Sequence, residues 1–169
     1  ATLIACGSTE TVLGEVERSF ADALGVACRM LEDSRLMAGG GATHVALARR
    51  LRRYAESIPG REQLGAEAFA DALEVIPRGL AENAGLDRID TLLQLVATQV
   101  NGGDDSHYIG LDLLNRRPAN MVEQGILEPY LITRQSIAGA TEAAISILRI
   151  DDVLWERQDP TMAEVPEME

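Results

Sequence analysis

Apolar residues recur at helical spacing through most of this chain, and this periodicity constrains the fold more than any other feature. Between residues 10 and 33 they return every three or four positions, which is typical of one long amphipathic helix. Its apolar stripe comprises Val12, Leu13, Val16, Phe20, Ala23, Leu24, Ala27, Cys28 and Leu31. Similar patterns predict helices over 42–57, 61–83, 87–98 and 129–148, the last one opened by a proline. The sequence therefore predicts a mainly α fold.

Local signals mark the ends of these helices. Ser8 or Thr9 is placed to cap the first helix, and Asp87 to cap the fourth. Gly85 is expected just past the end of the third helix, where a left-handed residue commonly stands. Pro77 lies inside that third helix and should kink or divide it.

A small β element is expected beside the helices. Residues 2–6 form a short β-like run, and residues 108–113 resemble a strand followed by a turn at 115–118. The last segment, 157–169, is acidic and rich in proline and methionine without periodicity, so we expect it to be a disordered tail.

Composition excludes several function classes. The net charge is −12 and every basic residue is an arginine. Without lysine there is no Walker-type phosphate loop and no Schiff-base chemistry. The acidic balance argues against binding to nucleic acid or to an anionic membrane, and no apolar run is long enough to span a bilayer. Cys6 and Cys28 have no metal-ligand spacing, which predicts no metal site and two small buried or half-buried thiols in a reducing cytoplasm.

A set of ordered strings carries the more specific signal. They are 39–42 (GGGA), 60–64 (GREQL), 67–74 (EAFADALE), 76–78 (IPR), 80–87 (LAENAGLD), 141–144 (TEAA) and 147–153 (ILRIDDV). Together they closely resemble the C-terminal part of group II chaperonin subunits, the archaeal thermosome and its eukaryotic cytosolic relatives. The resemblance covers residues 1–154, and the lysine-free, acidic version resembles a haloarchaeal thermosome.

The resemblance implies a part of a larger machine. The family's subunits form two stacked rings in the cytoplasm, enclose unfolded proteins and are driven by ATP. It implies that residues 1–36 hold the end of an apical strand and the returning intermediate-domain segment with the long helix. Residues 37–156 would be the C-terminal half of the equatorial ATPase domain, before the tail at 157–169. Because the chain starts at Ala1 in an apolar stretch, we expect a cut within a longer chain.

Asp22 is the candidate catalytic residue. It shares a polar stripe with Glu15, Arg18, Ser19 and Arg29, and considered alone it would be an ordinary solvated carboxylate. The resemblance implies that Asp22 is the intermediate-domain aspartate that is brought over the γ-phosphate. There it would orient and deprotonate the attacking water.

Three glycines precede the second helix. Gly39, Gly40 and Gly41 could be a flexible connector, or a backbone surface against which a nucleotide lies beside a helix N-terminus. The resemblance implies the second role, with Gly40 and Gly41 as the best matches.

The resemblance also implies an ATP/ADP site with further residues. Glu128 would accept both ribose hydroxyls, while Gly110 and Asp112 would lie beside the adenine; Asp112 could equally be a plain turn residue. The family's phosphate loop and Mg²⁺-binding aspartate have no counterpart in this chain. We therefore expect that the chain by itself neither hydrolyses ATP nor holds Mg²⁺-nucleotide tightly.

Two other features are open. His44 follows the glycines where the relatives usually carry an acidic residue, and a structural or surface role is favoured for it. The arginine cluster at 49–53 is expected to form intramolecular or subunit ion pairs.

The partners that the resemblance implies are other chaperonin subunits and unfolded clients, the latter through an apical domain. The alternative function is a non-catalytic helical module that mediates oligomerisation or interaction.

Overall fold

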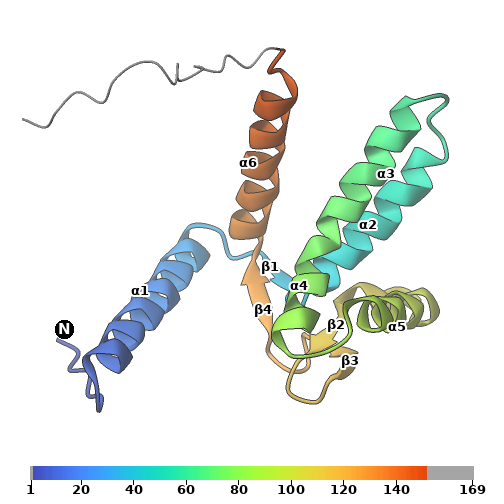
Figure 1. The fold of residues 1–169 in the computed structure, drawn as a ribbon. Coiled ribbons are helices and arrows are strands. Elements are labelled where there is room, and N and C mark those ends of the chain that lie inside the picture. The colour runs from blue at the N-terminus through green and yellow to red at the C-terminus, as the bar shows by residue number, and fades with distance from the viewer. Residues whose placement is uncertain (1, 152–169) are drawn as a thin grey trace, which may run out of the picture. The chain divides into compact units, whose positions relative to one another are not determined.

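The computed structural model describes residues 2–151, and the predicted disordered tail at 157–169 lies outside them. The described chain is mainly helical with two small sheets, as predicted (Figure 1). It divides into two compact units, Ala1–Thr133 and Arg134–Glu169, and the second contains most of the last helix. Both cysteines are free and exposed, so the expectation of buried thiols was wrong.

The first helix, α1 (Glu10–Glu32), forms where the periodicity predicted it. The Thr9 hydroxyl accepts a hydrogen bond from the Val12 amide at 3.3 Å and so caps it. None of its residues is buried, and its apolar stripe is open to solvent. The strand expected over residues 2–6 does not form: residues 2–7 carry no regular structure, because no described segment pairs with them.

Three helices follow the glycine-rich connector. The elements are α2 (Ala42–Ala55), α3 (Glu62–Leu73) and α4 (Val75–Asn83), and α2 lies side by side with α3 (Figure 1). The predicted helix over 61–83 thus divides at Glu74, shortly before Pro77. Pro77 is the third residue of α4, where its missing N–H costs nothing, since the first amides of a helix have no partner within it.

A buried ion-pair cluster fixes this arrangement. The Glu74 side chain is only 3% exposed and pairs with Arg52 of α2 and with Arg78 of α4. Arg52 also pairs with Asp71 of α3 at 2.6 Å, and these carboxylates raise the pKa of its guanidinium. The expectation of intramolecular ion pairs is confirmed at this arginine. One carboxylate at the division point therefore links three helices.

The predicted helix end at Gly85 and the predicted helix start at Asp87 are also confirmed. At the end of α4 the Leu86 amide donates to Ala81 and the Gly85 amide to Glu82, both at 2.9 Å, with Gly85 at a φ of +69°. This is the Schellman arrangement, which favours glycine. The Asp87 side chain then accepts from the first amides of α5 (Arg88–Asn101).

Two short antiparallel pairs complete the first unit. A 3-10 turn, η1 (Gly103–Tyr108), leads into β2 (Ile109–Asp112), where a strand was predicted. It pairs with β3 (Arg117–Asn120), a strand that was not predicted and that includes Arg117 and Pro118 of the expected turn. The connector before the glycines contains β1 (Leu36–Ala38), which pairs with β4 (Leu127–Pro129), and α6 (Tyr130–Leu148) begins directly after the proline.

The core consists of two small clusters around the glycine connector. One contains Ala38, Ala42 and Met121, between β1, the start of α2 and the end of the β2–β3 hairpin. The other joins α2 to α5 through Val45 and two leucines, Leu92 and Leu95. Both clusters hold the start of α2 in place.

Candidate functional site

The glycine connector is a tight turn between β1 and α2. Gly40 and Gly41 have φ values of +60° and +75°, a left-handed conformation that side chains disfavour. The Gly39 amide donates to the Ile126 carbonyl at 3.0 Å, and the Gly39 carbonyl accepts from the Ala42 amide at 3.1 Å. We refer to residues 39–41 as the glycine turn.

The backbone of β2 lies directly against the glycine turn. The Leu111 amide donates to the Gly40 carbonyl at 2.8 Å. A Cβ atom on Gly110 would stand 2.6 Å from the Gly39 carbonyl oxygen, and one on Gly40 would stand 2.6 Å from the Met121 sulfur. Gly40 and Gly110, far apart in sequence, are therefore required by the same close backbone approach.

The start of α2 next to this turn has no side-chain cap. Gly41 is the N-cap residue, so no side chain caps the helix, and its first turn carries no acidic residue. Within the described range 2–151, the amides of Thr43 and His44 have no hydrogen-bond acceptor. Free N–H groups at the N-terminus of a helix favour an anion such as a phosphate group.

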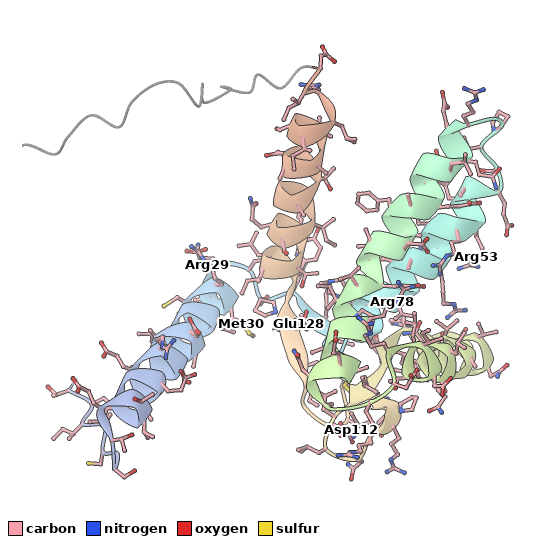
Figure 2. All side chains as sticks on the ribbon, viewed as in Figure 1. Arg29, Met30, Arg53, Arg78, Asp112 and Glu128 are labelled. Carbon is pink, nitrogen blue, oxygen red and sulfur yellow. The ribbon has the colours of Figure 1, made fainter. Side chains whose placement is uncertain are left out.

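Glu128 brings a carboxylate to the same turn. It stands opposite Met37 in the β1–β4 pair and is half-buried; Figure 2 labels it on β4. One oxygen accepts from the Thr133 hydroxyl at 3.3 Å, and the other lies 3.3 Å from the position of a Cβ on Gly39. A carboxylate with one oxygen available can accept hydroxyl groups of a sugar.

The charge of this carboxylate acts on the pKa of His44. Burial lowers the pKa of the His44 imidazole, and the charge on Glu128 opposes that shift only in part. The half-buried ring is therefore held mostly neutral near pH 7. The weak sequence signal at His44 thus belongs to the edge of the site.

Asp112 is placed differently from the other candidates. Its buried carboxylate accepts four hydrogen bonds, from the amides of Leu114 and Asn115 and from the side chains of Asn115 and Gln124. Led by the bond from the Asn115 side chain, these donors lower the pKa of Asp112 to about 2. Figure 2 labels it at the turn between β2 and β3. Its side chain holds this turn, in agreement with the alternative that it is a turn residue.

Asp22 is exposed on α1. Two of the residues in its polar stripe, Arg18 and Glu15, pair with each other at 2.6 Å. Among the described residues its own carboxylate has no ion-pair or hydrogen-bond partner, and no such bond joins it to the glycine turn. The structure therefore brings together the turn, Gly110 and Glu128, and leaves Asp22 as a solvated carboxylate.

Two buried polar residues, one beside the turn and one among the helices, escaped the sequence analysis. Gln99 is buried against the turn, and Glu74 is buried among the helices that follow it. The spacing of Gln99 from Leu95 and Leu92, four and seven residues, places it on the buried face of α5 and could have revealed it. Over residues 2–151, no three His, Cys, Asp or Glu side chains are grouped to hold a metal ion. No helix in this part of the chain is both long and apolar enough for a membrane span.

Comparison with known proteins defines the class. Residues 1–158 match the TCP-1/cpn60 chaperonin family, and the chain belongs to this family. Within it, the chain is similar to the thermosome subunits of the group II chaperonins. It is 52% identical to the thermosome subunit of Methanocaldococcus jannaschii and 55% identical to thermosome subunit alpha of Halobacterium salinarum, in each case over 90% of this chain.

A solved structure supports the same assignment. The open-state monomer of a group II chaperonin from Methanococcoides burtonii matches 85% of this chain with a TM-score of 0.70 and 42% identity, over 35% of its own length. The chain spans only 28% and 27% of the lengths of the two thermosome subunits named above.

Proposed function

We propose that this chain is part of an ATP-dependent group II chaperonin whose stacked rings enclose and fold unfolded proteins. Residues 1–36 would belong to the end of the apical strand and the intermediate domain, and residues 37–156 to the C-terminal half of the equatorial domain. The partners would be other subunits of the double ring and unfolded clients bound by an apical domain. The acidic, lysine-free composition fits the cytoplasm of a halophilic archaeon.

One observation carries the proposal: the glycine turn, Gly110 and Glu128 converge beside the uncapped start of α2. A nucleotide needs a backbone surface without side chains, donors for phosphate oxygens and acceptors for ribose hydroxyls. The turn, the free amides of α2 and the Glu128 carboxylate offer these three properties together.

The site residues would contact different parts of the nucleotide. Gly40 and Gly41 would line the phosphate side, Glu128 would accept the ribose hydroxyls, and Gly110 and Asp112 would adjoin the adenine. Because the Asp112 side chain already accepts four hydrogen bonds, we assign its contribution to the shape of the turn it holds.

Asp22 would act on water. An exposed carboxylate without a partner is able to accept the proton of an attacking water and to orient it, provided that a domain movement brings it to the γ-phosphate. Mg²⁺, held mainly by residues outside this chain, would neutralise phosphate charge when bound. On this account the chain alone is not a competent ATPase.

A comparison of ATP with 2′-deoxy-ATP tests the assignment of Glu128. In a full-length subunit that carries this sequence, we expect Glu128→Gln to weaken ATP binding about tenfold while binding of 2′-deoxy-ATP changes much less, because the lost contact involves the ribose hydroxyls. Glu123→Gln is the matched control, since Glu123 precedes β4 in the chain, is exposed, and within residues 2–151 its carboxylate accepts a hydrogen bond from Asn120 alone.

This experiment distinguishes the ATP-dependent chaperonin from the alternative, a non-catalytic oligomerisation module. Equal losses for both nucleotides would remove Glu128 from the ribose site. Rings that assemble but bind neither nucleotide in the wild type would favour the non-catalytic oligomerisation module instead.

A further inference from the structure

Gln99 is the most completely buried polar residue in the part of the chain that the structure describes. It lies on α5, is 1% exposed, and belongs to the largest fully buried side chains. A buried primary amide needs partners for both of its N–H groups, since leaving one unpaired is costly. The place where those N–H groups point therefore indicates what the residue does.

The amide nitrogen of Gln99 donates to two backbone carbonyls that are far apart in sequence. One belongs to Ala42, at 3.0 Å, and the other to Ile109, at 2.8 Å. Ala42 directly follows the glycine turn and is the first residue of α2, whereas Ile109 directly precedes Gly110 and is the first residue of β2. One side chain thus connects the two backbone segments that form the candidate site.

The chemistry of this contact admits only a donor. Both acceptors are carbonyl oxygens, so the NH₂ group must face them, and a flipped amide or a carboxylate would set oxygen against oxygen. The Gln99 oxygen faces away and accepts a long bond from Arg49 at 3.4 Å. Between the glycine turn and β2 themselves, the described residues make one direct backbone bond, from the Leu111 amide to the Gly40 carbonyl.

We propose that Gln99 is a positioning residue for the nucleotide pocket: its amide sets the separation between the glycine turn and β2, and so preorganises the two walls for nucleotide. This proposal rests on the proposed function of the site. Without the amide, the walls would be joined by one backbone bond and by packing, and ordering them would oppose nucleotide binding.

The expected signature is a change in affinity without a change in turnover. Loss of two neutral hydrogen bonds that order a binding site corresponds to about a tenfold rise in the Kd and KM for ATP. The hydrogen bonds of the Gln99 side chain go to Ala42, Ile109 and Arg49, none of which lies on α1 with the hydrolytic candidate Asp22. We therefore expect kcat at saturating ATP to remain within about twofold of wild type.

The experiment measures ATP binding and steady-state hydrolysis in the assembled full-length subunit that carries this sequence. Gln99→Met keeps the volume and removes both donors, and Gln99→Glu keeps a partner for Arg49 but also removes both donors. Arg49→Met removes only the long bond to the amide oxygen. Gln94→Met is the matched control, because Gln94 is an exposed glutamine on the same helix.

The proposal predicts a raised Kd and KM with retained kcat for both Gln99 variants, and values near wild type for Arg49→Met and Gln94→Met. Wild-type affinity in Gln99→Met would overturn it while leaving the proposed function intact. A wild-type subunit that binds no nucleotide would instead overturn the proposed function.

A milder variant covers the case in which Gln99→Met does not assemble. Gln99→Asn keeps the amide but is shorter by one methylene, so it cannot span both carbonyls, and the same criteria apply to it. If neither variant assembles, the proposal is refuted, because Gln99 would then stabilise the fold as a whole.

Discussion

Replacing Gly110 with alanine tests the close backbone approach on which the site depends. The new Cβ would lie 2.6 Å from the Gly39 carbonyl oxygen and 2.6 Å from the Met121 Cγ atom, well inside van der Waals contact. The methionine side chain can move, but the Gly39 carbonyl is backbone held by the Ala42 amide. The glycine turn and β2 must therefore separate.

The magnitude follows from these contacts. Overpacking costs about 1–3 kcal/mol, and a clash with fixed backbone belongs at the upper end. Alanine also restricts the unfolded chain, which offsets about 0.5–1 kcal/mol. Gly110 does not have a positive φ, so no backbone strain is added. The net loss is about 2 kcal/mol, roughly a thirtyfold change in the ratio of folded to unfolded protein.

Urea denaturation of the 169-residue chain, followed by circular dichroism, measures this loss. With an ordinary slope, 2 kcal/mol lowers the midpoint by about 1 M. Gly79→Ala is the control: this glycine is in the interior of α4 with nothing within 4 Å of an added Cβ, so alanine should stabilise by about 0.5–1 kcal/mol. A midpoint for Gly110→Ala at or above wild type would refute the reasoning.

Three further predictions concern charge. Glu74→Gln should cost about 2 kcal/mol in the same denaturation assay, because it breaks a buried pair whose arginines, Arg52 and Arg78, are 37% and 38% exposed and regain some hydration. Asp71→Asn, at an exposed pair with the same arginine, should change stability by less than about 0.5 kcal/mol, and equal losses would contradict the role of burial. The lowered pKa of His44 means that the unfolded chain binds more protons below its ordinary pKa of 6.5, so stability should fall as the pH drops from 7 to 5.5. Melting temperatures measured between pH 7 and 5.5 check this: His44→Gln should reduce their fall, and a fall as large as in wild type would count against a lowered pKa of His44. Finally, the net charge of −12 predicts a melting temperature that rises substantially with molar KCl, and a salt-independent melt would argue against halophilic adaptation.

The helices could be predicted because their signals are local. Thr9, Gly85 and Asp87 cap or terminate helices through bonds to residues within a few positions, and the structure confirms each one. Strands depend on a partner elsewhere in the chain. The run at 2–6 has strand character without a partner, whereas Leu36–Ala38 is a strand only because Leu127–Pro129 pairs with it.

The site was predicted in part, and by resemblance. The family resemblance implied roles for Gly40, Gly110 and Glu128, but their proximity follows from tertiary contacts that no local pattern encodes. Gln99 was missed because a lone glutamine on a helix is usually a surface residue; its spacing from Leu92 and Leu95 indicates the buried face of α5, but the two carbonyls it meets come from tertiary structure. Asp112 could be assigned either way until the four donors to its carboxylate were known.

ATP hydrolysis by the assembled full-length subunit, measured in parallel with ATP binding for wild type and Asp22→Ala, tests the central claim most directly. Glu17→Ala is the control, since Glu17 is another exposed carboxylate on α1. The account predicts that Asp22→Ala binds ATP with wild-type affinity but loses turnover, while Glu17→Ala retains it. Turnover by Asp22→Ala close to the wild-type rate would contradict the account.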